Sequence, residues 1–245
     1  MADTALLDVD GTLVDTNYQH AIAWYRAFRR HDLTVPVWRI HRAIGMGGDQ
    51  LVPAVAGDGF EREHGDDARE AWVEEFDRLL PEVQPFDGAR DLIVELGRRG
   101  WKVVLASSGK GQHVEAFLDL LDARELCEAW TSSDDAESSK PAPDLFQVAL
   151  QKVEGRDGVV LGDSTWDVQA AAKADLPAVA LRTGGYSVDE LREAGAVAVH
   201  DSMRELIDAL DSTPLGAPGS GSGSDSDSDS GPRTVPPSPL SFPSS

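Results

Sequence analysis

The sequence has one cysteine, no lysine before Lys102 and no long apolar run. Because Cys127 is alone, an intrachain disulfide is excluded, and the chain suits a reducing compartment. No apolar stretch approaches the length of a membrane span, and no basic segment followed by an apolar core opens the sequence. These absences predict a cytoplasmic protein without a membrane partner.

Basic residues are scarce as a class. The 245 residues include 22 Lys and Arg against 43 Asp and Glu, which gives a formal net charge of −21. This balance argues against nucleic acid or an anionic membrane as a partner. A protein of this charge that handles phosphate must therefore supply cations locally.

Among the residues that are present, the most informative lie near the start of the chain. The apolar residues Ala5, Leu6, Leu7 and Val9 predict a short buried strand, and this strand ends at the acids Asp8 and Asp10. In open α/β sheets, ligands bind beyond the carboxyl ends of the strands. Two carboxylates about 4 Å apart repel by roughly 4 kcal/mol at the dielectric of a protein surface, so they need a cation or a proton between them. An ordinary acidic turn at a strand end is the alternative.

Two regions of different pattern follow. Helical patterns alone fill residues 16–84, whereas from residue 85 apolar strands alternate with helices, which predicts an α/β fold with a doubly wound, parallel, Rossmann-like sheet. The first region is therefore a small all-helical insertion after the first strand. The expected helices are 16–31 with Thr16 as N-cap, a short one from Pro36 through Ile44, one from Asp49, then 66–80, 89–99, 114–121, 144–153 and 167–174. The expected later strands are 103–106, 129–131, 159–161 and 178–181.

Residues 212–245 have the composition of a tail. Ser, Gly, Pro and Asp dominate this stretch, and its apolar surface is too small to offset the entropy of ordering. We interpret it as a disordered linker or terminus rather than as a metal site built from its aspartates. The catalytic core is thereby assigned to 1–15 and 85–211.

Three further stretches place polar side chains at predicted strand ends or helix starts. Ser107-Ser108-Gly109-Lys110 follows one strand and can hold a phosphate oxygen through hydroxyl and backbone N–H groups. Lys140 stands beside prolines that fix the backbone before a helix. Asp163 and Asp167 follow the strand 159–161, and oxygen ligands at strand ends suit Mg²⁺. Taken singly, each stretch also fits a common turn, a solvated lysine or a helix cap.

Together these stretches resemble the haloacid dehalogenase-like (HAD) hydrolase superfamily, most of whose members are magnesium-dependent phosphatases. Asp8-Val9-Asp10-Gly11-Thr12 is similar to the first motif of that family, and Ser107 matches the Ser or Thr of the second. Lys140 stands in a Lys-Pro-x-Pro-x-x-Phe pattern like the third motif, and Gly-Asp-Ser-x-x-Asp at 162–167 resembles the fourth. The resemblance covers about residues 1–210, with 16–84 as a helical cap.

The resemblance implies covalent phosphoryl transfer. Asp8 would attack phosphorus and form an aspartyl phosphate that water then hydrolyses, while Asp10 would protonate the leaving alcohol and later deprotonate the water. Mg²⁺ would bind the Asp8 carboxylate, the Asp10 backbone carbonyl and Asp163, with Asp167 binding it directly or supporting its ligands.

Other residues are implied in substrate contact. Ser107, with Ser108 beside it, and Lys140 would hold the phosphoryl oxygens. In the cap, Thr16, His20 and Gly47 could contact the substrate or assist Asp10. For His20, a catalytic role and simple packing on a helix both remain open.

Related reactions are separated by single residues. Haloacid dehalogenases lack the second aspartate that Asp10 provides, and phosphonoacetaldehyde hydrolases need a cap lysine, which 16–84 does not contain. Thr16 and His20 also resemble the cap hinge of β-phosphoglucomutases. A mutase must hold a second phosphate from its cap, yet the loop 45–50 has no Arg or Lys and Arg39 and Arg42 are merely nearby, so hydrolysis is favoured.

A non-catalytic protein is the remaining alternative. Receiver domains accept a phosphoryl group on a similar set of residues, but they lack a large helical insertion after the first strand. A chain that only binds a partner would be expected to have lost an acid or Lys140, and none is missing. We therefore expect a small phosphorylated metabolite as substrate, of the phosphoglycolate or sugar phosphate type, because a closing cap excludes large ones. The oligomeric state is left open.

Overall fold

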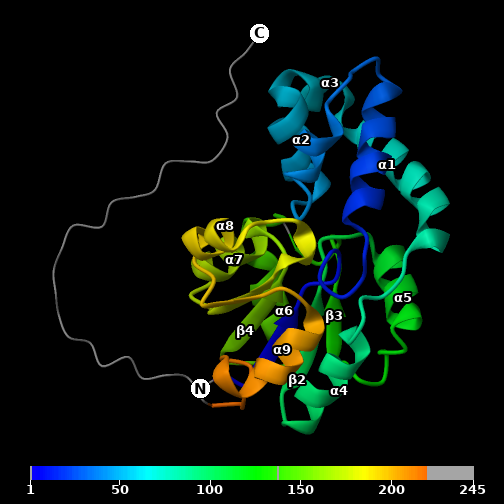
Figure 1. Ribbon diagram of the computed structural model, residues 1–245. Helices are drawn as coiled ribbons and strands as arrows, with labels where there is room; N and C mark the ends of the chain where they lie inside the picture. Colours follow the sequence, from blue (N-terminus) through cyan, green and yellow to red (C-terminus); the bar gives the residue numbers. More distant parts are fainter. Residues whose placement is uncertain (1, 137, 220–245) are drawn as a thin grey trace, which may run out of the picture.

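A parallel sheet forms the centre of the molecule. The computed structural model describes residues 2–136 and 138–219, and within these the sheet has six strands in the order β3-β2-β1-β4-β5-β6, with every neighbouring pair parallel (Figure 1). The strands are β1 (Thr4–Leu7), β2 (Lys102–Ala106), β3 (Ala129–Thr131), β4 (Gly158–Gly162), β5 (Ala178–Leu181) and β6 (Ala198–His200). The predicted doubly wound α/β fold is confirmed. Strand β6 was not predicted, because it is short and only half-buried.

Helices cover both faces of this sheet because successive strand residues point to opposite sides. Leu6 and Val160 pack among residues of α6, α7 and α8, whereas Leu7 and Val159 belong to the core formed with α4, α5 and α9. The helices of the core are α4 (Ala89–Arg98), α5 (Gly111–Leu120), α6 (Asp144–Lys152), α7 (Thr165–Lys173), α8 (Val188–Ala194) and α9 (Met203–Ala209), with 3₁₀ turns η2 (Arg182–Gly184) and η3 (Leu210–Ser212). Strands buried on both faces explain the continuous apolar runs of the sequence.

The segment 16–84 is helical, as predicted, and stands apart from the sheet at the top of Figure 1. We call this segment the cap. Its elements are α1 (Asn17–Arg29), α2 (Val37–His41), α3 (Gly48–Leu79) and the 3₁₀ turn η1 (Leu80–Glu82). Stacked rings of Trp24, Phe28, Trp72 and Phe76 join α1 to α3. The cap therefore has a hydrophobic core that helps hold its helices together.

Helix bounds in the cap differ from those expected. One element spans Gly48–Leu79, but Gly57 interrupts it with φ 87° and ψ 159°, so its second arm begins well before the predicted start at residue 66. Only glycine adopts that backbone without strain, and the kink needs no other cause. Helix α2 ends at His41 rather than at the Gly45–Gly48 loop, although Ile44 is still buried.

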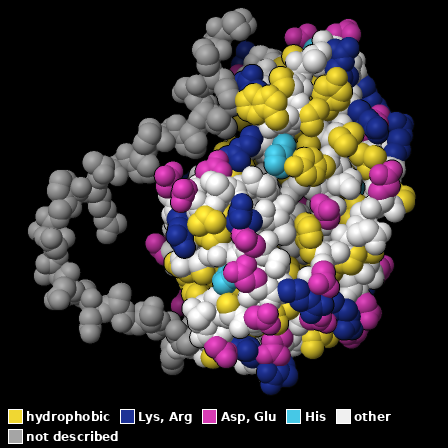
Figure 2. Space-filling view, in the orientation of Figure 1, with side chains coloured by type: hydrophobic (Ala, Val, Ile, Leu, Met, Phe, Trp, Pro, Cys, Tyr) yellow, Lys and Arg dark blue, Asp and Glu magenta, His cyan; other side chains and the backbone are white. Residues whose placement is uncertain are grey.

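The outer face of the cap exposes apolar side chains. Figure 2 shows hydrophobic side chains gathered over the cap, while acidic and basic groups mix lower on the molecule. Tyr18, Ile22, Val37 and Trp38 are exposed there, and the Tyr18 ring stacks on His41 with centroids 5.0 Å apart. Among the described residues, no helix is both long and apolar enough to span a bilayer.

The prediction of disorder from residue 212 is wrong for residues 212–219. Residues 212–219 pack against the core: Leu215 is fully buried, its carbonyl accepts a hydrogen bond of 3.1 Å from the Trp101 indole, and the Gly219 amide donates to the Ala2 carbonyl at 2.8 Å. A single buried leucine within a polar stretch has no periodicity, so composition alone placed it in the tail. Residues 220–245 lie outside the described residues.

Replacing Leu215 by Ala should therefore destabilise the fold. Removing a fully buried leucine side chain costs about 2–5 kcal/mol, whereas Leu120→Ala, at a position 39% exposed, should cost less than about 0.5 kcal/mol. Urea unfolding followed by circular dichroism measures both free energies. Equal and small losses would mean that residues 212–219 behave as the tail that the sequence predicts.

Candidate active site

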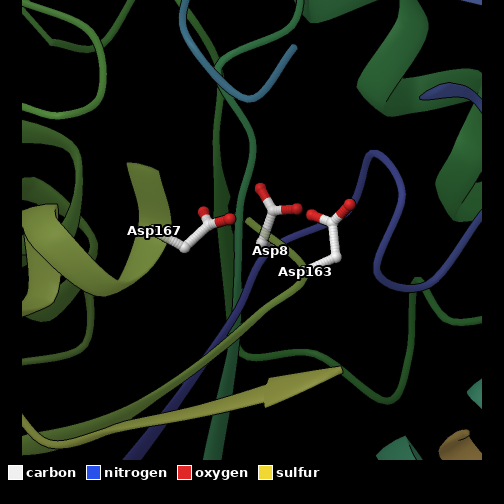
Figure 3. A group of neighbouring side chains, drawn as sticks. All are labelled: Asp8, Asp163 and Asp167. Carbon is white, nitrogen blue, oxygen red and sulfur yellow. The ribbon is translucent and has the colours of Figure 1, made fainter. Parts of the chain in front are cut away.

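Three buried carboxylates converge at the carboxyl end of the central strands. Asp8 directly follows β1 and Asp163 directly follows β4, and the pairing of Leu7 with Leu161 sets these strand ends side by side. Asp167 enters from the first turn of α7. Figure 3 shows the three side chains pointing toward one another, and each offers an oxygen within 4.8 Å of the others. The strand order runs from β1 toward β3 on one side and from β4 toward β6 on the other, and ligands bind at the crevice where the order switches in such sheets.

Glycine makes this close approach of chains possible. Gly11 turns the chain after β1 with φ +80°, and a Cβ there would lie 2.2 Å from Oδ2 of Asp163. Gly184 is equally constrained, because its Cβ would lie 2.4 Å from the same oxygen. Only residues without a side chain fit on these two sides of Asp163.

Lys140 is the buried cation of the site. Its side chain is 1% exposed, and Nζ pairs with Asp8 Oδ1, with Asp167 Oδ1 at 2.7 Å and with the Ala106 carbonyl at 3.2 Å. One positive charge therefore faces three carboxylates. The site retains an excess of negative charge when all three acids are ionised.

Burial and this excess of negative charge raise the pKa of Asp8 and of Asp163. Burial, with Asp167 and Asp10 nearby, raises the pKa of Asp8 to about 7 against the pull of Lys140. Burial and the charges of Asp167 and Asp8 raise the pKa of Asp163 well above its usual value. Carboxyl groups in this state bind a proton readily, and a divalent cation would stabilise their charged form instead.

Asp10 turns its carboxylate away from this cluster. Oδ1 contacts His20 Nε2 at 2.8 Å and accepts the Thr16 hydroxyl at 3.0 Å, while Oδ2 accepts the Ser107 hydroxyl at 3.0 Å. Burial opposes ionisation, but His20 and the hydrogen bonds outweigh it and lower the pKa of Asp10. The pKa of Asp8 is thus raised and that of Asp10 is lowered, although the two residues belong to one loop. Such a separation of pKa values suits acid–base chemistry.

His20 both packs and contacts an acid, so the two expectations for it are compatible. Its ring stacks on Phe76 with centroids 4.1 Å apart, while Nε2 faces Asp10. Thr16 starts helix α1 as predicted, but its hydroxyl makes no capping hydrogen bond and goes to Asp10 instead. Contacts of Thr16 and His20 with the Asp10 carboxylate therefore hold the first turn of the cap against the core.

The two predicted phosphate-binding serines differ in whether their hydroxyl groups already have hydrogen-bond partners. Ser107 is fully buried, and its hydroxyl is occupied by Asp10 and by the Gly109 amide, which donates to it at 2.9 Å. Ser108 borders the cavity, and its buried Oγ has no hydrogen-bond partner among the described residues. Ser108 is therefore a donor available to a ligand, whereas Ser107 is committed to Asp10.

A cavity of about 260 Å³ opens above Asp8 between the core and the cap. Asp8 and Asp10 form part of its wall, opposite the cap loop that contains Gly47. The Gly47 amide donates to Ser139 Oγ at 3.0 Å, so this loop is hydrogen-bonded to the segment that precedes Lys140. The cavity is large enough for a small metabolite and closed by the cap on one side.

The two basic residues that border the cavity were missed by the sequence analysis. Arg69 of α3 and Lys110 of the core both border the cavity. The Arg69 guanidinium is paired with Glu61 at 3.0 Å and Asp66 at 2.8 Å, whereas the side chain of Lys110 forms no ion pair or hydrogen bond within the described part of the chain. Arg69 reaches the cavity from far along a kinked helix, so its sequence position carried no signal. Lys110 was noted only as part of a turn.

Comparison with known proteins identifies the family to which this chain belongs. A sequence profile of haloacid dehalogenase-like hydrolases matches residues 2–175. The chain is 28% identical over 202 residues to validoxylamine A 7'-phosphate phosphatase of Streptomyces hygroscopicus subsp. limoneus, covering 79% of this chain and 92% of that protein. It is 28% identical over 191 residues to fructose-1-phosphate phosphatase YqaB of Escherichia coli, covering 72% and 95%.

Solved structures agree with the sequence relatives. The crystal structure of a hydrolase from Pseudomonas syringae superposes with a TM-score of 0.81 at 31% identity, covering 85% of this chain and 98% of that one. The profile match spans most of the chain and includes Asp8, Ser107, Lys140 and Asp163. The chain belongs to the haloacid dehalogenase-like hydrolase family.

Proposed function

We propose that this protein is a Mg²⁺-dependent phosphatase that hydrolyses a small phosphomonoester through an aspartyl phosphate on Asp8. One observation carries the proposal: Asp8 borders the cavity, while it is paired to Lys140 and grouped with two further buried acids. A carboxylate in that position can meet phosphorus, and the charges around it can hold the phosphoryl oxygens.

In the first step an Asp8 oxygen attacks phosphorus and the bond from phosphorus to the ester oxygen breaks. The leaving alkoxide needs a proton, and Asp10 is the acid on the cavity wall placed to give it. Asp10 is ionised in the free enzyme because its pKa is lowered. A bound phosphate dianion opposes that ionisation, so substrate binding favours the protonated form of Asp10.

The second step hydrolyses the aspartyl phosphate and regenerates the free enzyme. Asp10, now ionised, accepts a proton from water, which attacks phosphorus and releases Asp8 and inorganic phosphate. Lys140 and the Ser108 hydroxyl supply charge and a hydrogen bond to phosphoryl oxygens in both steps. Ser107 acts through Asp10, because its hydroxyl keeps that carboxylate in place.

The buried acids fit Mg²⁺. Asp8, Asp163 and Asp167 offer only carboxylate oxygens, which this hard cation prefers, and their excess charge needs a cation. The Asp10 carboxylate lies outside this group, so its predicted contribution is limited to its backbone carbonyl and stays a prediction. When bound, Mg²⁺ supplies positive charge to the phosphoryl group and to the Asp8 carboxylate.

The substrate class follows from the cavity. Trp24, Trp72 and Met46 give it an apolar wall, while Asp49 and Lys110 offer polar groups. A small polyhydroxylated phosphate ester, such as a sugar phosphate, matches this mixture, and phosphoglycolate is a smaller candidate. The relatives named above are a validoxylamine A 7'-phosphate phosphatase and a fructose-1-phosphate phosphatase, which supports a small phosphate ester as substrate. The acidic charge disfavours nucleic acid, and a metabolite substrate with a lone cysteine suits the cytoplasm.

A phosphomutase is the second candidate, and Arg69 and Lys110 favour it. Both cations border the cavity, whereas the sequence indicated no cation in the cap loop. The Arg69 charge is already paired with Glu61 and Asp66, which leaves Lys110 as the one cavity cation without an ion pair among the described residues, so hydrolysis remains the better proposal. A receiver domain does not fit, because the helical cap stands between β1 and β2.

The choice between hydrolysis and transfer can be measured on hexose monophosphates. Hydrolysis predicts that released inorganic phosphate equals the substrate consumed at every time point. Phosphomutase activity instead yields an isomeric monophosphate with little free phosphate. Phosphorus NMR of the reaction mixture separates the two outcomes, with a hexose bisphosphate added as primer in a parallel sample.

Asp8→Asn should abolish phosphate release. The amide cannot form the aspartyl phosphate, so activity against a panel of phosphomonoesters should fall by at least about 10³-fold with or without Mg²⁺. Asp15→Asn is the matched control, because Asp15 is an exposed acid of the same segment and should keep wild-type activity. Circular dichroism checks that both variants fold. Substantial turnover by Asp8→Asn would remove Asp8 as nucleophile.

Mg²⁺ should stabilise the protein more at pH 8 than at pH 5.5. The pKa of Asp8 is raised to about 7, so between its unfolded value and 7 the unfolded chain releases a proton that the metal-free fold retains, and the fold loses stability as pH rises. Below pH 7 Mg²⁺ must displace a proton, whereas above it the carboxylate is free to bind. Thermal unfolding with MgCl₂, and with NaCl at matched ionic strength, measures the shift. Equal Mg²⁺ shifts at both pH values would contradict the assignment.

A further inference from the structure

Asn17 joins the cap to the group of buried acids. It is the first residue of α1, it is buried, and its Nδ2 donates to Asp163 Oδ2 at 2.8 Å. The donor belongs to the cap and the acceptor to the core, 146 residues apart in the chain. Asn17 does not border the cavity, so it has no part in the chemistry proposed above.

The oxygen that accepts this hydrogen bond has no other polar partner within the described residues. The backbones of Gly11 and Gly184 enclose Asp163 Oδ2, each leaving no room for a Cβ, and Asn17 supplies its hydrogen bond. The other oxygen, Oδ1, lies 3.3 Å from the Thr12 hydroxyl, which donates to Asp8 Oδ2 at 2.9 Å. Holding Oδ2 in this slot therefore keeps Oδ1 on the side of Asp8.

We propose that Asn17 is a positioning residue for the metal, and that it couples metal binding to docking of the cap. The inference rests on the proposed Mg²⁺ site. Asn17 fixes the rotation of the Asp163 carboxylate, so that one oxygen faces the cation. Because it is neutral, the amide does this without adding charge to a site that already holds three acids and Lys140. Partners that orient a ligand in this way typically contribute 10- to 100-fold to metal affinity.

Coupling follows from where Asn17 stands. The hydrogen bond exists only while α1 lies against the core, so a docked cap favours the metal-binding orientation of Asp163. By thermodynamic reciprocity, a bound metal favours the docked cap to the same extent. Thr16 and His20 in the same turn contact Asp10. The first turn of α1 therefore touches both the metal-binding acids and the acid–base residue.

Titration of Mg²⁺ alone into the full chain tests the inference. Asn17→Ala should weaken the Mg²⁺ dissociation constant, measured by calorimetry, by about 10- to 100-fold. Its activity at saturating Mg²⁺ should recover to within about threefold of wild type, whereas damage to the cap itself would not be rescued by the metal. Asn17→Leu fills the same space without an N–H donor and should behave alike, which keeps the test valid if the alanine variant folds poorly.

The matched control breaks a different contact between cap and core. Arg42 of the cap pairs with Glu190 and lies over the Tyr186 ring, and it forms no ion pair with Asp8, Asp163 or Asp167, so Arg42→Gln should leave Mg²⁺ affinity unchanged. Hydrogen exchange supplies a second readout: Mg²⁺ should slow exchange of α1 amides in wild type and in Arg42→Gln, but not in Asn17→Ala.

The outcomes separate the two proposals. A wild-type chain that binds no Mg²⁺ defeats the proposed metal site itself. A wild-type chain that binds it, with Asn17→Ala and Asn17→Leu binding equally well, overturns the inference about Asn17 alone. Weakened binding with unchanged exchange protection in α1 overturns the coupling to the cap.

Discussion

The burial of three carboxylates around a single lysine is the constraint on which the rest of the site depends. Taking an ion out of water costs several kcal/mol, and like charges at this range add to that cost. Lys140 offsets part of it, and hydrogen bonds to the acids offset more: Thr12 to Asp8, Asn17 to Asp163, and Ser164 to Asp167. What is left uncompensated is negative charge, and this is the property that a cation-binding site needs.

The fold supplies this constraint through topology rather than through any one segment. Asp8 and Asp163 are distant in sequence, yet parallel pairing of β1 and β4 sets their strand ends next to each other. Asp167 caps α7 with one oxygen, in a reciprocal pair with Ser164, and pairs with Lys140 through the other. Asp167 can therefore take part in the N-terminal cap of α7 and in the charged site at once, because its two oxygens face different partners.

The cap is more than a cover for this site. Its first turn carries Thr16, Asn17 and His20, whose polar atoms all reach acids of the core. The same His20 ring stacks on Phe76 inside the cap, so cap packing and acid orientation share one side chain. Docking of the cap therefore changes the environment of both acids of the first loop, one directly and one through Asp163 and Thr12.

The sequence predicted the features that are local in the chain. Strand ends marked by Asp8 and Asp163, the helical nature of 16–84 and the parallel sheet follow from runs of a few residues and their order. The assignment of roles to Asp8, Asp10 and Lys140 came from motif resemblance and stays a proposal. Features that depend on three-dimensional contact were missed: Asn17, the cavity position of Arg69, and the burial of Leu215 leave no periodic pattern.

Because the whole molecule is strongly acidic, binding of a phosphate ester depends on positive charges close to the site. A formal charge of −21 repels a phosphate dianion as it approaches, although salt screens this repulsion beyond about 8 Å at physiological ionic strength. Inside the cavity that screening is weaker, so the proposed function makes substrate binding depend on Lys140 beside Asp8, on Lys110 at the cavity wall and on the proposed cation. The protein therefore gains little from long-range attraction of its substrate. In the proposed function, selectivity for a phosphate ester would rest instead on short-range contacts in the cavity between core and cap.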